Sequence, residues 1–218
     1  MKLHNNTIRG VHTALEAIFE QGHYADKVIE RTLKSNPKWG AKDRSFIAET
    51  TYEMVRWWRL VNFLSPSKEP WDLFGTYWLM QGNELPPWEE FARLQPEKIK
   101  SKYEAITDPG LLESIPEWLQ TLGSQELGEK WEAEIHALNE EAEVVLRVNT
   151  LKTTRERLKN LLEADGIRSY LVKGYPDALV LEERQNVFRH PSFKEGLFEV
   201  QDASSQLVAA ALLVEPGM

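Results

Sequence analysis

The chain has 218 residues, of which 42% are hydrophobic and 28% charged; its formal net charge is −8 and it contains no cysteine. These values exclude disulfides, thiolate nucleophiles and cysteine-ligated metals, and they argue against a protein that binds nucleic acid over its whole surface. No stretch approaches the roughly 18 apolar residues that a membrane span needs, and the N-terminus lacks a signal peptide, so we expect a cytoplasmic protein without membrane contact.

Apolar residues at three-and-four spacing predict three amphipathic helices in the first 64 residues. The first is expected to end near Gly22, and the second is closed by Asn36-Pro37. The third is predicted as one long helix with Asp43 as its N-cap, stopped by Ser65-Pro66. Because none of the three buries its apolar face alone, we expect them to pack as a bundle.

Residues 65–135 are cut by prolines into short pieces, and the pattern predicts helices near 71–80, 87–93, 111–122 and 126–139. Most of the chain's tryptophans lie between Trp57 and Trp131. Such residues stack on RNA bases in some proteins, but at helical spacing they are more often core, and we favour the core interpretation.

The pattern changes after residue 140. Residues 143–149 alternate, with Val144, Leu146 and Val148 on one face and Val145, Arg147 and Asn149 on the other, which predicts a half-buried strand. Further strands are expected near 168–172, 178–182 and 197–201. The sequence therefore predicts a small RRM/ferredoxin-like α/β domain over 141–218, preceded by an all-α domain over 1–140.

Two helices are expected among these strands. Thr153-Thr154-Arg155-Glu156 reads as a capping box with Thr153 as N-cap, and Gly166 suits the C-terminus of that helix. Its predicted buried face consists of three leucines: Leu158, Leu161 and Leu162. A last helix is predicted over 204–213, with Asp202 as its N-cap.

No catalytic constellation is visible. The five histidines are scattered, without the spacing of a metal site, and the chain has no dinucleotide-binding glycine motif, P-loop or nucleophile elbow. Charge is uneven, however: from Lys27 to Arg44 six basic residues face two acids, and from Arg147 to Lys159 five face one. Because a polyanion responds to local potential, two such patches remain compatible with RNA binding, although basic runs are usually only solvated helix faces.

Two stretches resemble a known family. VVLRVNTLKTTRERLKNLLEADGI, PDALVLEE and NVFRHPSFKEGLFEVQDASSQLVAAALLVEPG, within residues 144–217, are similar to the segment before the catalytic domain in the RsmB/Fmu/Sun group of RNA cytosine-5 methyltransferases. AKDRSFIAETTYEMVRWWRLVNFL resembles the long helix of the NusB-like RNA-binding domain in some members. The resemblance implies a NusB-like helical bundle over residues 1–140. Within it, residues 65–135 resemble no segment of the family.

The resemblance also implies a function: the RNA-binding part of an S-adenosylmethionine-dependent enzyme that methylates cytosine C5, most simply in 16S ribosomal RNA. In that family a thiolate adds to cytosine C6 so that C5 can take the methyl group. The glycine-rich cofactor loop and the two cysteine motifs follow an EPG run, whereas this sequence stops at Gly217-Met218. We therefore expect the chain alone to be inactive, with no catalytic or metal-binding residue, and its partners to be RNA and a C-terminal methyltransferase domain.

Six residues are the candidates for RNA contact. Arg147, Asn149 and Lys152 lie on or after the first strand, where they suit phosphates or a base edge; the alternative for Arg147 is an ion pair with Glu143. In the helical part the candidates are Arg9, Lys42 and Arg44, with an ion pair to Asp43 or Glu49 as the alternative for Arg44.

Three residues are candidates for the methyl-donor site. The run Gln201-Asp202-Ala203-Ser204-Ser205-Gln206 resembles the family motif that packs beside the cofactor pocket, which implies that Gln201, Asp202 and Ser205 line it. The alternative is that Asp202 only caps the last helix, worth about 0.5–2 kcal/mol, and we favour the cap. A second hypothesis for the whole chain is a stand-alone NusB-like RNA- or protein-binding factor without catalysis.

Overall fold

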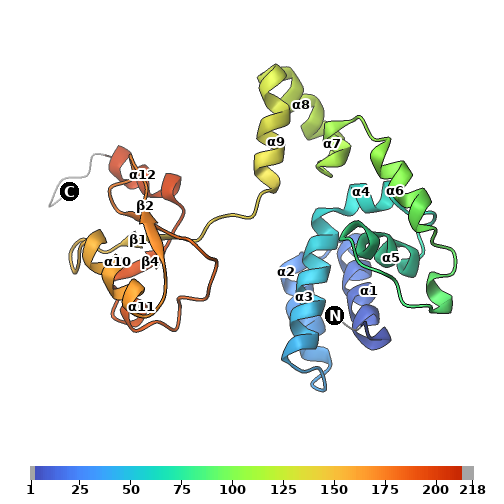
Figure 1. The fold of residues 1–218 in the computed structure, drawn as a ribbon, viewed down its shortest axis with the longest axis horizontal. Helices are drawn as coiled ribbons and strands as arrows, with labels where there is room; N and C mark the ends of the chain where they lie inside the picture. Colours follow the sequence, from blue (N-terminus) through green and yellow to red (C-terminus); the bar gives the residue numbers. More distant parts are fainter. Residues whose placement is uncertain (1–2, 213–218) are drawn as a thin grey trace. The chain divides into compact units, whose positions relative to one another are not determined.

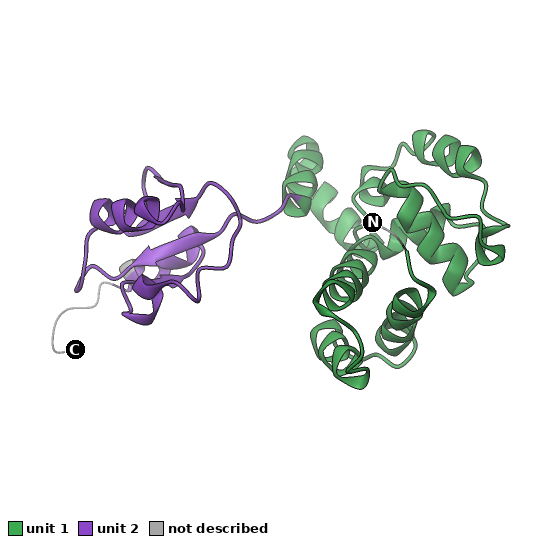
Figure 2. Ribbon diagram, turned by 60° about the horizontal axis from the view of Figure 1, so that its bottom comes forward, with its two compact units in different colours: residues 1–139 green, residues 140–218 purple. Residues whose placement is uncertain are grey.

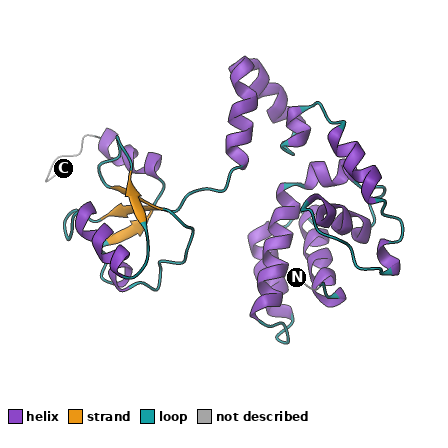
Figure 3. Ribbon diagram, in the orientation of Figure 1, coloured by secondary structure: helices purple, strands orange, loops and turns teal. Residues whose placement is uncertain are grey.

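The computed structural model of the chain describes residues 3–212 and divides it into two compact units, residues 1–139 and residues 140–218 (Figures 1 and 2). The first unit is entirely helical and the second contains a four-stranded sheet (Figure 3). The predicted order, a helical region followed by a small domain of mixed helix and sheet, is confirmed. The expectations for Leu213 and for the Glu215-Pro216-Gly217 run lie outside the described residues.

The three helices expected first are present, but the third is shorter than predicted. Helices α1 (Asn5–Phe19), α2 (Ala25–Ser35) and α3 (Ala41–Arg56) pack against one another. The predicted continuation of α3 is wrong, because the backbone leaves the helix at Trp57 and a separate helix, α4 (Trp58–Leu64), begins there. The break allows the apolar residues of α4 to pack on the next helix while those of α3 face α1.

The start of α3 also differs from the prediction. Gly40, not Asp43, is the N-cap, and Asp43 lies in the first turn of the helix. The Oδ2 atom of Asp43 accepts a hydrogen bond from the backbone N–H of Gly40 at 3.0 Å. Asp43 therefore occupies the third helical position, from which the acidic residue of a capping box stabilises the helix start. The prediction had placed it at the N-cap instead.

The rest of the first unit consists of short helices. The predicted 71–80 helix is confirmed as α5, but 87–93 holds only a short 3₁₀ turn, and α6 was not anticipated. The expected 111–122 helix is split, because Ser114 adopts a positive φ of 56° and Pro116 follows it, and the 126–139 helix is split at Gly128, with φ 56°. The elements are α5 (Pro70–Met80), η1 (Glu89–Phe91), α6 (Pro96–Glu104), α7 (Pro109–Leu112), α8 (Glu117–Leu127), η2 (Gly128–Lys130) and α9 (Trp131–Asn139).

Aromatic side chains form much of the first unit's interior. Phe74 is fully buried and stacks on Trp78 and Phe91, at centroid distances of 5.9 and 6.2 Å. Trp39 and Trp131 are buried, and the five tryptophans between positions 57 and 88 are half-buried against the main core. The core interpretation of the tryptophans is therefore confirmed for all but Trp118, whose side chain is 66% exposed.

The second unit is built on an antiparallel sheet of order β2-β3-β1-β4. The predicted strands are all present, and a short helix, α11, precedes the last of them. The elements are β1 (Val145–Val148), α10 (Arg155–Ala164), β2 (Ser169–Leu171), β3 (Ala178–Leu181), α11 (Pro191–Lys194), β4 (Phe198–Val200) and α12 (Ala203–Ala211).

The alternation along β1 is present as predicted, but the strand was expected to be half-buried and instead has an apolar cluster on each face. Leu146 and Val148 join the cluster that α10 covers, in which Leu158 and Leu162 are fully buried. On the opposite face, Val145 packs with residues of β3 and with Ala203 at the start of α12. The side chain of Arg147 projects on this second face, where its cross-strand partners are Ala178 and Glu199.

Two details of α10 correct the sequence prediction. The N-cap is Thr154, whose Oγ1 accepts from the N–H of Arg157 at 3.2 Å, whereas Thr153 is buried one residue earlier. Leu161, predicted to be buried, is 39% exposed, because the face of α10 that meets the sheet is centred on Leu158 and Leu162. Gly166, with φ 79°, ends the helix as expected.

Candidate RNA-binding surface

Arg147 is the one residue proposed for RNA contact in the second unit whose side chain has no polar partner among the described residues. Its side chain is exposed on β1, and within residues 3–212 its guanidinium makes no hydrogen bond or ion pair. Glu143, the alternative partner, instead accepts a 2.5 Å hydrogen bond from the hydroxyl of Tyr170, which raises the pKa of that phenol. Arg147 therefore remains available to a phosphate or a base edge.

Asn149 and Lys152 have structural partners. The Nδ2 of Asn149 donates to the carbonyl of Gly196 at 2.9 Å, while its Oδ1 accepts from the N–H of Leu151 at 3.2 Å. Lys152 Nζ donates to the carbonyl of Glu195 at 2.7 Å. Both side chains thus fasten the turn after β1 to the turn that follows α11.

The glycine at this attachment is needed for two reasons. Gly196 has a φ of 68°, which L side chains rarely adopt, and a Cβ there would lie 3.0 Å from Lys152 Nζ. The lysine and the glycine turn therefore fit each other closely. Among Arg147, Asn149 and Lys152, only Arg147 has a side chain without a hydrogen bond or ion pair to the described residues.

Arg44 in the first unit holds the connection between α2 and α3. Its Nε donates to the carbonyl of Trp39 at 2.9 Å, its Nη1 to Leu33 at 2.6 Å and its Nη2 to Asn36 at 3.3 Å. These acceptors include carbonyls at the end of α2, where a cation is favourable. Neither alternative ion pair, to Asp43 or to Glu49, is formed in the described structure.

Arg9 and Lys42 are exposed on α1 and α3. The Nε of Arg9 donates to Oδ1 of Asn5 at 2.7 Å, which leaves the remaining guanidinium donors unbonded among the described residues. Lys42 has no hydrogen bond or ion pair there. Elsewhere in the basic run, Lys34 pairs with Glu30 at 2.6 Å, and that contact lowers the pKa of the Glu30 carboxyl.

The three candidate cofactor residues surround the start of α12. The carboxylate of Asp202 accepts from the backbone N–H of Ser204 at 2.9 Å and of Ser205 at 3.2 Å, and these bonds, with that to the Ser204 hydroxyl, lower the pKa of Asp202. The predicted N-cap is therefore present. Gln201 donates its N–H to the carbonyl of Val145, and its buried Oε1 has no hydrogen-bond partner among the described residues.

The role of these three side chains at a methyl-donor site stays a prediction. The carboxylate of Asp202 is taken up by the cap, and neither of the two cavities described below is lined by Gln201, Asp202 or Ser205. Within the same run, the Oε1 atoms of Gln201 and Gln206 are both buried without a hydrogen-bond partner among the described residues. No group of three or more histidine, aspartate or glutamate side chains suitable for a metal occurs within the described part of the chain.

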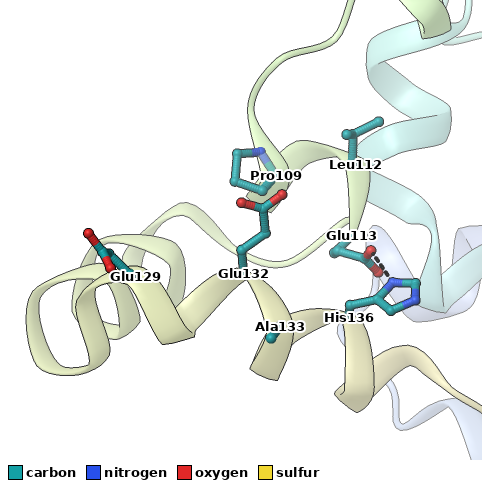
Figure 4. A pocket seen from close by; sticks show the side chains of 7 residues that line it. All are labelled: Pro109, Leu112, Glu113, Glu129, Glu132, Ala133 and His136. Atoms are coloured by element: carbon teal, nitrogen blue, oxygen red, sulfur yellow. Dashed lines mark hydrogen bonds and ion pairs between the residues drawn. The ribbon is translucent and has the colours of Figure 1, made fainter.

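Two cavities of the first unit were not anticipated. One, of about 450 Å³, lies beside α7 and α9, where His136 Nδ1 and Glu113 Oε1 are 2.9 Å apart and Glu129 and Glu132 add two carboxylates (Figure 4). Its acidic lining is unsuited to a polyanion. The other, of about 230 Å³, is lined by three cations, two of which belong to the run of alternating lysines near residue 100.

The comparisons with known proteins come from sequence and from structure. Residues 115–188 match the RsmF/B-like methyltransferase ferredoxin-like domain, a match that begins ahead of α8 and so includes the last two helices of the first unit. The chain is 38% identical over 97 residues to ribosomal RNA small subunit methyltransferase B of Proteus mirabilis, which is 44% of this chain and 23% of that protein. It is 34% identical over 110 residues to the same-named protein of Pseudomonas syringae pv. tomato, which is 50% of this chain and 25% of that protein.

A solved structure resembles the fold. The crystal structure of PH0851 superposes with a TM-score of 0.62 at 17% identity, over 100% of this chain and 57% of that one. At this identity the likeness concerns the fold alone. The chain thus matches about a quarter of the length of the two methyltransferases. Among the described residues, no helix is long and apolar enough to cross a membrane.

Proposed function

Because this chain carries the RsmF/B-like ferredoxin-like domain and is related to the small-subunit ribosomal RNA methyltransferases, we propose that it is the RNA-binding portion of an S-adenosylmethionine-dependent ribosomal RNA methyltransferase of the RsmB/Sun type. The observation that carries the proposal is the match of residues 115–188, reinforced by relatives over about half of the chain. The substrate position is cytosine C5 of 16S ribosomal RNA, and the protein works in the cytoplasm.

Exposed cations of both units support the RNA-binding role. Three of the candidate side chains are exposed and have free hydrogen-bond donors among the described residues: Arg147 on β1, Arg9 on α1 and Lys42 on α3. Arg9 uses only its Nε, in the bond to Asn5. Arginine and lysine head groups contact phosphates, and a guanidinium also reads a base edge with two hydrogen bonds. Arg44, Asn149 and Lys152 contribute indirectly, since their bonds hold the segments that carry these cations.

The chemistry of C5 methylation places the reacting groups in another part of the protein. A thiolate must add to C6 before C5 becomes nucleophilic, and this chain contains no cysteine. The methyl donor supplies the transferred methyl group when bound, and Gln201, Asp202 and Ser205 contribute at most one edge of its site. We therefore propose that the 218 residues bind RNA and pack against a methyltransferase domain but transfer no methyl group alone.

A stand-alone NusB-like binding factor is the competing proposal. It accounts for the helical unit, which has a core of its own. It offers no reason for the second unit, of which β1, β2 and β3 lie in the stretch that matches a methyltransferase-associated domain. The methyltransferase proposal accounts for both.

The test combines binding and chemistry on the same RNA. We expect the chain to bind a structured fragment of small-subunit ribosomal RNA with an affinity that falls steeply between 50 and 200 mM salt, because phosphate contacts release counterions. With tritiated S-adenosylmethionine, the chain alone should label no RNA, whereas a longer protein that contains it should label cytosine C5. Absence of RNA binding at low salt, or a longer protein that labels another atom, contradicts the proposal.

A further inference from the structure

A basic groove lies between the end of α4 and the start of α6, outside both basic runs of the sequence analysis. The groove is a cavity of about 230 Å³. Its cations are Arg93, Lys98 and Lys102, and no carboxylate lines it. The remaining lining residues are Leu64, Ser65, Pro66, Gln95 and Ile99.

The floor of the groove is rigid and apolar. Leu64 and Ile99 are buried members of the main core, with 2% and 7% of their surfaces exposed. Ser65 is fixed by a 2.7 Å hydrogen bond from its hydroxyl to the carbonyl of Ser67. Arg93, Lys98 and Lys102 therefore line the edge of a cavity whose base is already formed in the folded chain.

The three cations differ in how far they are engaged. Lys102 Nζ donates to the carbonyl of Phe63 and lies 4.4 Å from the centroid of that ring, so it satisfies the end of α4. Arg93 Nη1 lies 3.8 Å from the buried carboxylate of Asp72, a long contact for an arginine whose side chain is 70% exposed. Lys98 is exposed and has no hydrogen bond or ion pair in the part of the chain that the structure describes.

The groove brings like charges close together. Lys98 and Lys102 are four residues apart on α6, and like charges at that spacing destabilise a helix. A third cation borders the same hollow. An anion in the groove would relieve this repulsion, and an apolar floor beneath a cationic rim suits a phosphate carried on a sugar and base.

We propose that the groove between α4 and α6 binds a backbone phosphate of the RNA strand. Lys98, which has no partner among the described residues, and Arg93, whose contact with Asp72 is long, would bind the phosphate, and Lys102 would line the groove beside them. This inference rests on the proposed RNA-binding function and adds a contact site to it. The acidic cavity beside α7 and α9 provides a contrast within the same unit, since its carboxylates repel a strand that the basic groove attracts.

Charge reversal on one helix provides a matched test. Lys98→Glu and Lys100→Glu change the net charge of α6 equally, but only Lys98 lines the groove, and Lys100 is exposed elsewhere on the same helix. We expect Lys98→Glu to weaken binding to the small-subunit RNA fragment about tenfold at low salt and to reduce the salt slope by about one. Lys100→Glu should change affinity less than about threefold.

Stability separates a lost contact from a damaged fold. A carboxylate at position 98 would attract Lys102 four residues later, so the melting temperature of Lys98→Glu should equal or slightly exceed that of the wild type. Equal RNA affinity for the two lysine variants overturns the groove while leaving the RNA-binding function intact. Failure of the wild-type chain to bind the RNA at 50 mM salt overturns both.

Discussion

The two sets of residues proposed for RNA contact, one in each unit, divide in the same way. In the helical unit, Arg44 donates to three backbone carbonyls, whereas Lys42, two residues earlier, is exposed and unpaired among the described residues. In the sheet unit, Lys152 and Asn149 bind the carbonyls of a neighbouring turn, whereas Arg147 remains free.

The same cause explains the division in both units: some of the polar side chains lie near backbone carbonyls at the ends of helices and turns. Helices and turns end with carbonyl groups that lack partners, and a long cationic or amide side chain within reach satisfies them. Arg44, near the end of α2, and Asn149 and Lys152, near the end of α11, bind such carbonyls. Arg147 on a regular strand and Lys42 in the first turn of a helix do not. The backbone around each polar side chain therefore decides its role. Side chains that bind nearby carbonyls stabilise the fold (the fastening group), and those without such carbonyls are free to contact a ligand.

The largest effect should come from the fastening arginine. Arg44→Ala removes three hydrogen bonds from a charged donor, so we expect the first unit to lose about 3 kcal/mol of unfolding free energy. All eight tryptophans lie in that unit, so urea unfolding followed by tryptophan fluorescence reports on it alone. Lys42→Ala is the control, with less than about 0.5 kcal/mol of change. Equal losses for the two variants would contradict the division.

The next effect is a pH dependence specific to the helical unit. Burial, with a contribution from Arg9, lowers the pKa of His12 to about 4 from 6.5, and the imidazole packs edge-on against Trp71 at 4.9 Å. The folded state therefore binds this proton less readily than the unfolded state. Stability is fully present above pH 6.5 and falls as the pH drops towards 4, by about 2 kcal/mol between pH 7 and pH 5.

The measurement for His12 uses the same fluorescence signal at both pH values. His12→Gln should lose the histidine contribution to this pH dependence, whereas the exposed His23→Gln should retain it. An unchanged slope in His12→Gln would show that the burial of this imidazole does not govern the titration.

A smaller effect is expected at the turn after β1. Asn149→Ala removes the bonds to Gly196 and to the N–H of Leu151, which together should stabilise the second unit by about 1–2 kcal/mol. Because this unit has no tryptophan, hydrogen exchange of peptides covering residues 145–200 is the suitable readout. Lys173→Ala, at an exposed position, is the control, and equal exchange in the two variants would argue against a fastening role for the asparagine.

The smallest change concerns affinity rather than stability. Arg147→Ala should leave the unfolding free energy of the second unit unchanged, because the guanidinium makes no described contact, and should weaken RNA binding about fivefold. Arg189→Ala removes the same charge from another exposed position of that unit. A loss of stability in Arg147→Ala would place Arg147 among the side chains that stabilise the fold. Equal affinity for the two variants would remove it from the proposed RNA-contacting residues.

Hydrophobic periodicity was sufficient to predict much of the architecture. The alternation from Val144 to Val148 predicted a strand and the face that packs under α10, because side chains of a strand point to opposite faces whatever surrounds them. The second apolar cluster, which includes Val145, was not predicted. The cap at Asp202 and the helix end at Gly166 were likewise predicted, since both depend on bonds or dihedral angles within a few residues. The motif resemblance in residues 144–217 led to the family that the comparisons support.

Other features depended on contacts between distant residues. The break at Trp57 separates a helix that packs on α1 from one that packs on α5, and no local residue type required it. The basic groove joins residues of the segment 64–66 to residues of the segment 93–102, and Lys102 reaches the carbonyl of Phe63, 39 positions earlier in the chain. Local sequence therefore determined most of the elements and the number of cations. Tertiary structure decided where α3 breaks, which cations meet backbone carbonyls and which remain free to meet a phosphate, because only folding brings those partners within reach.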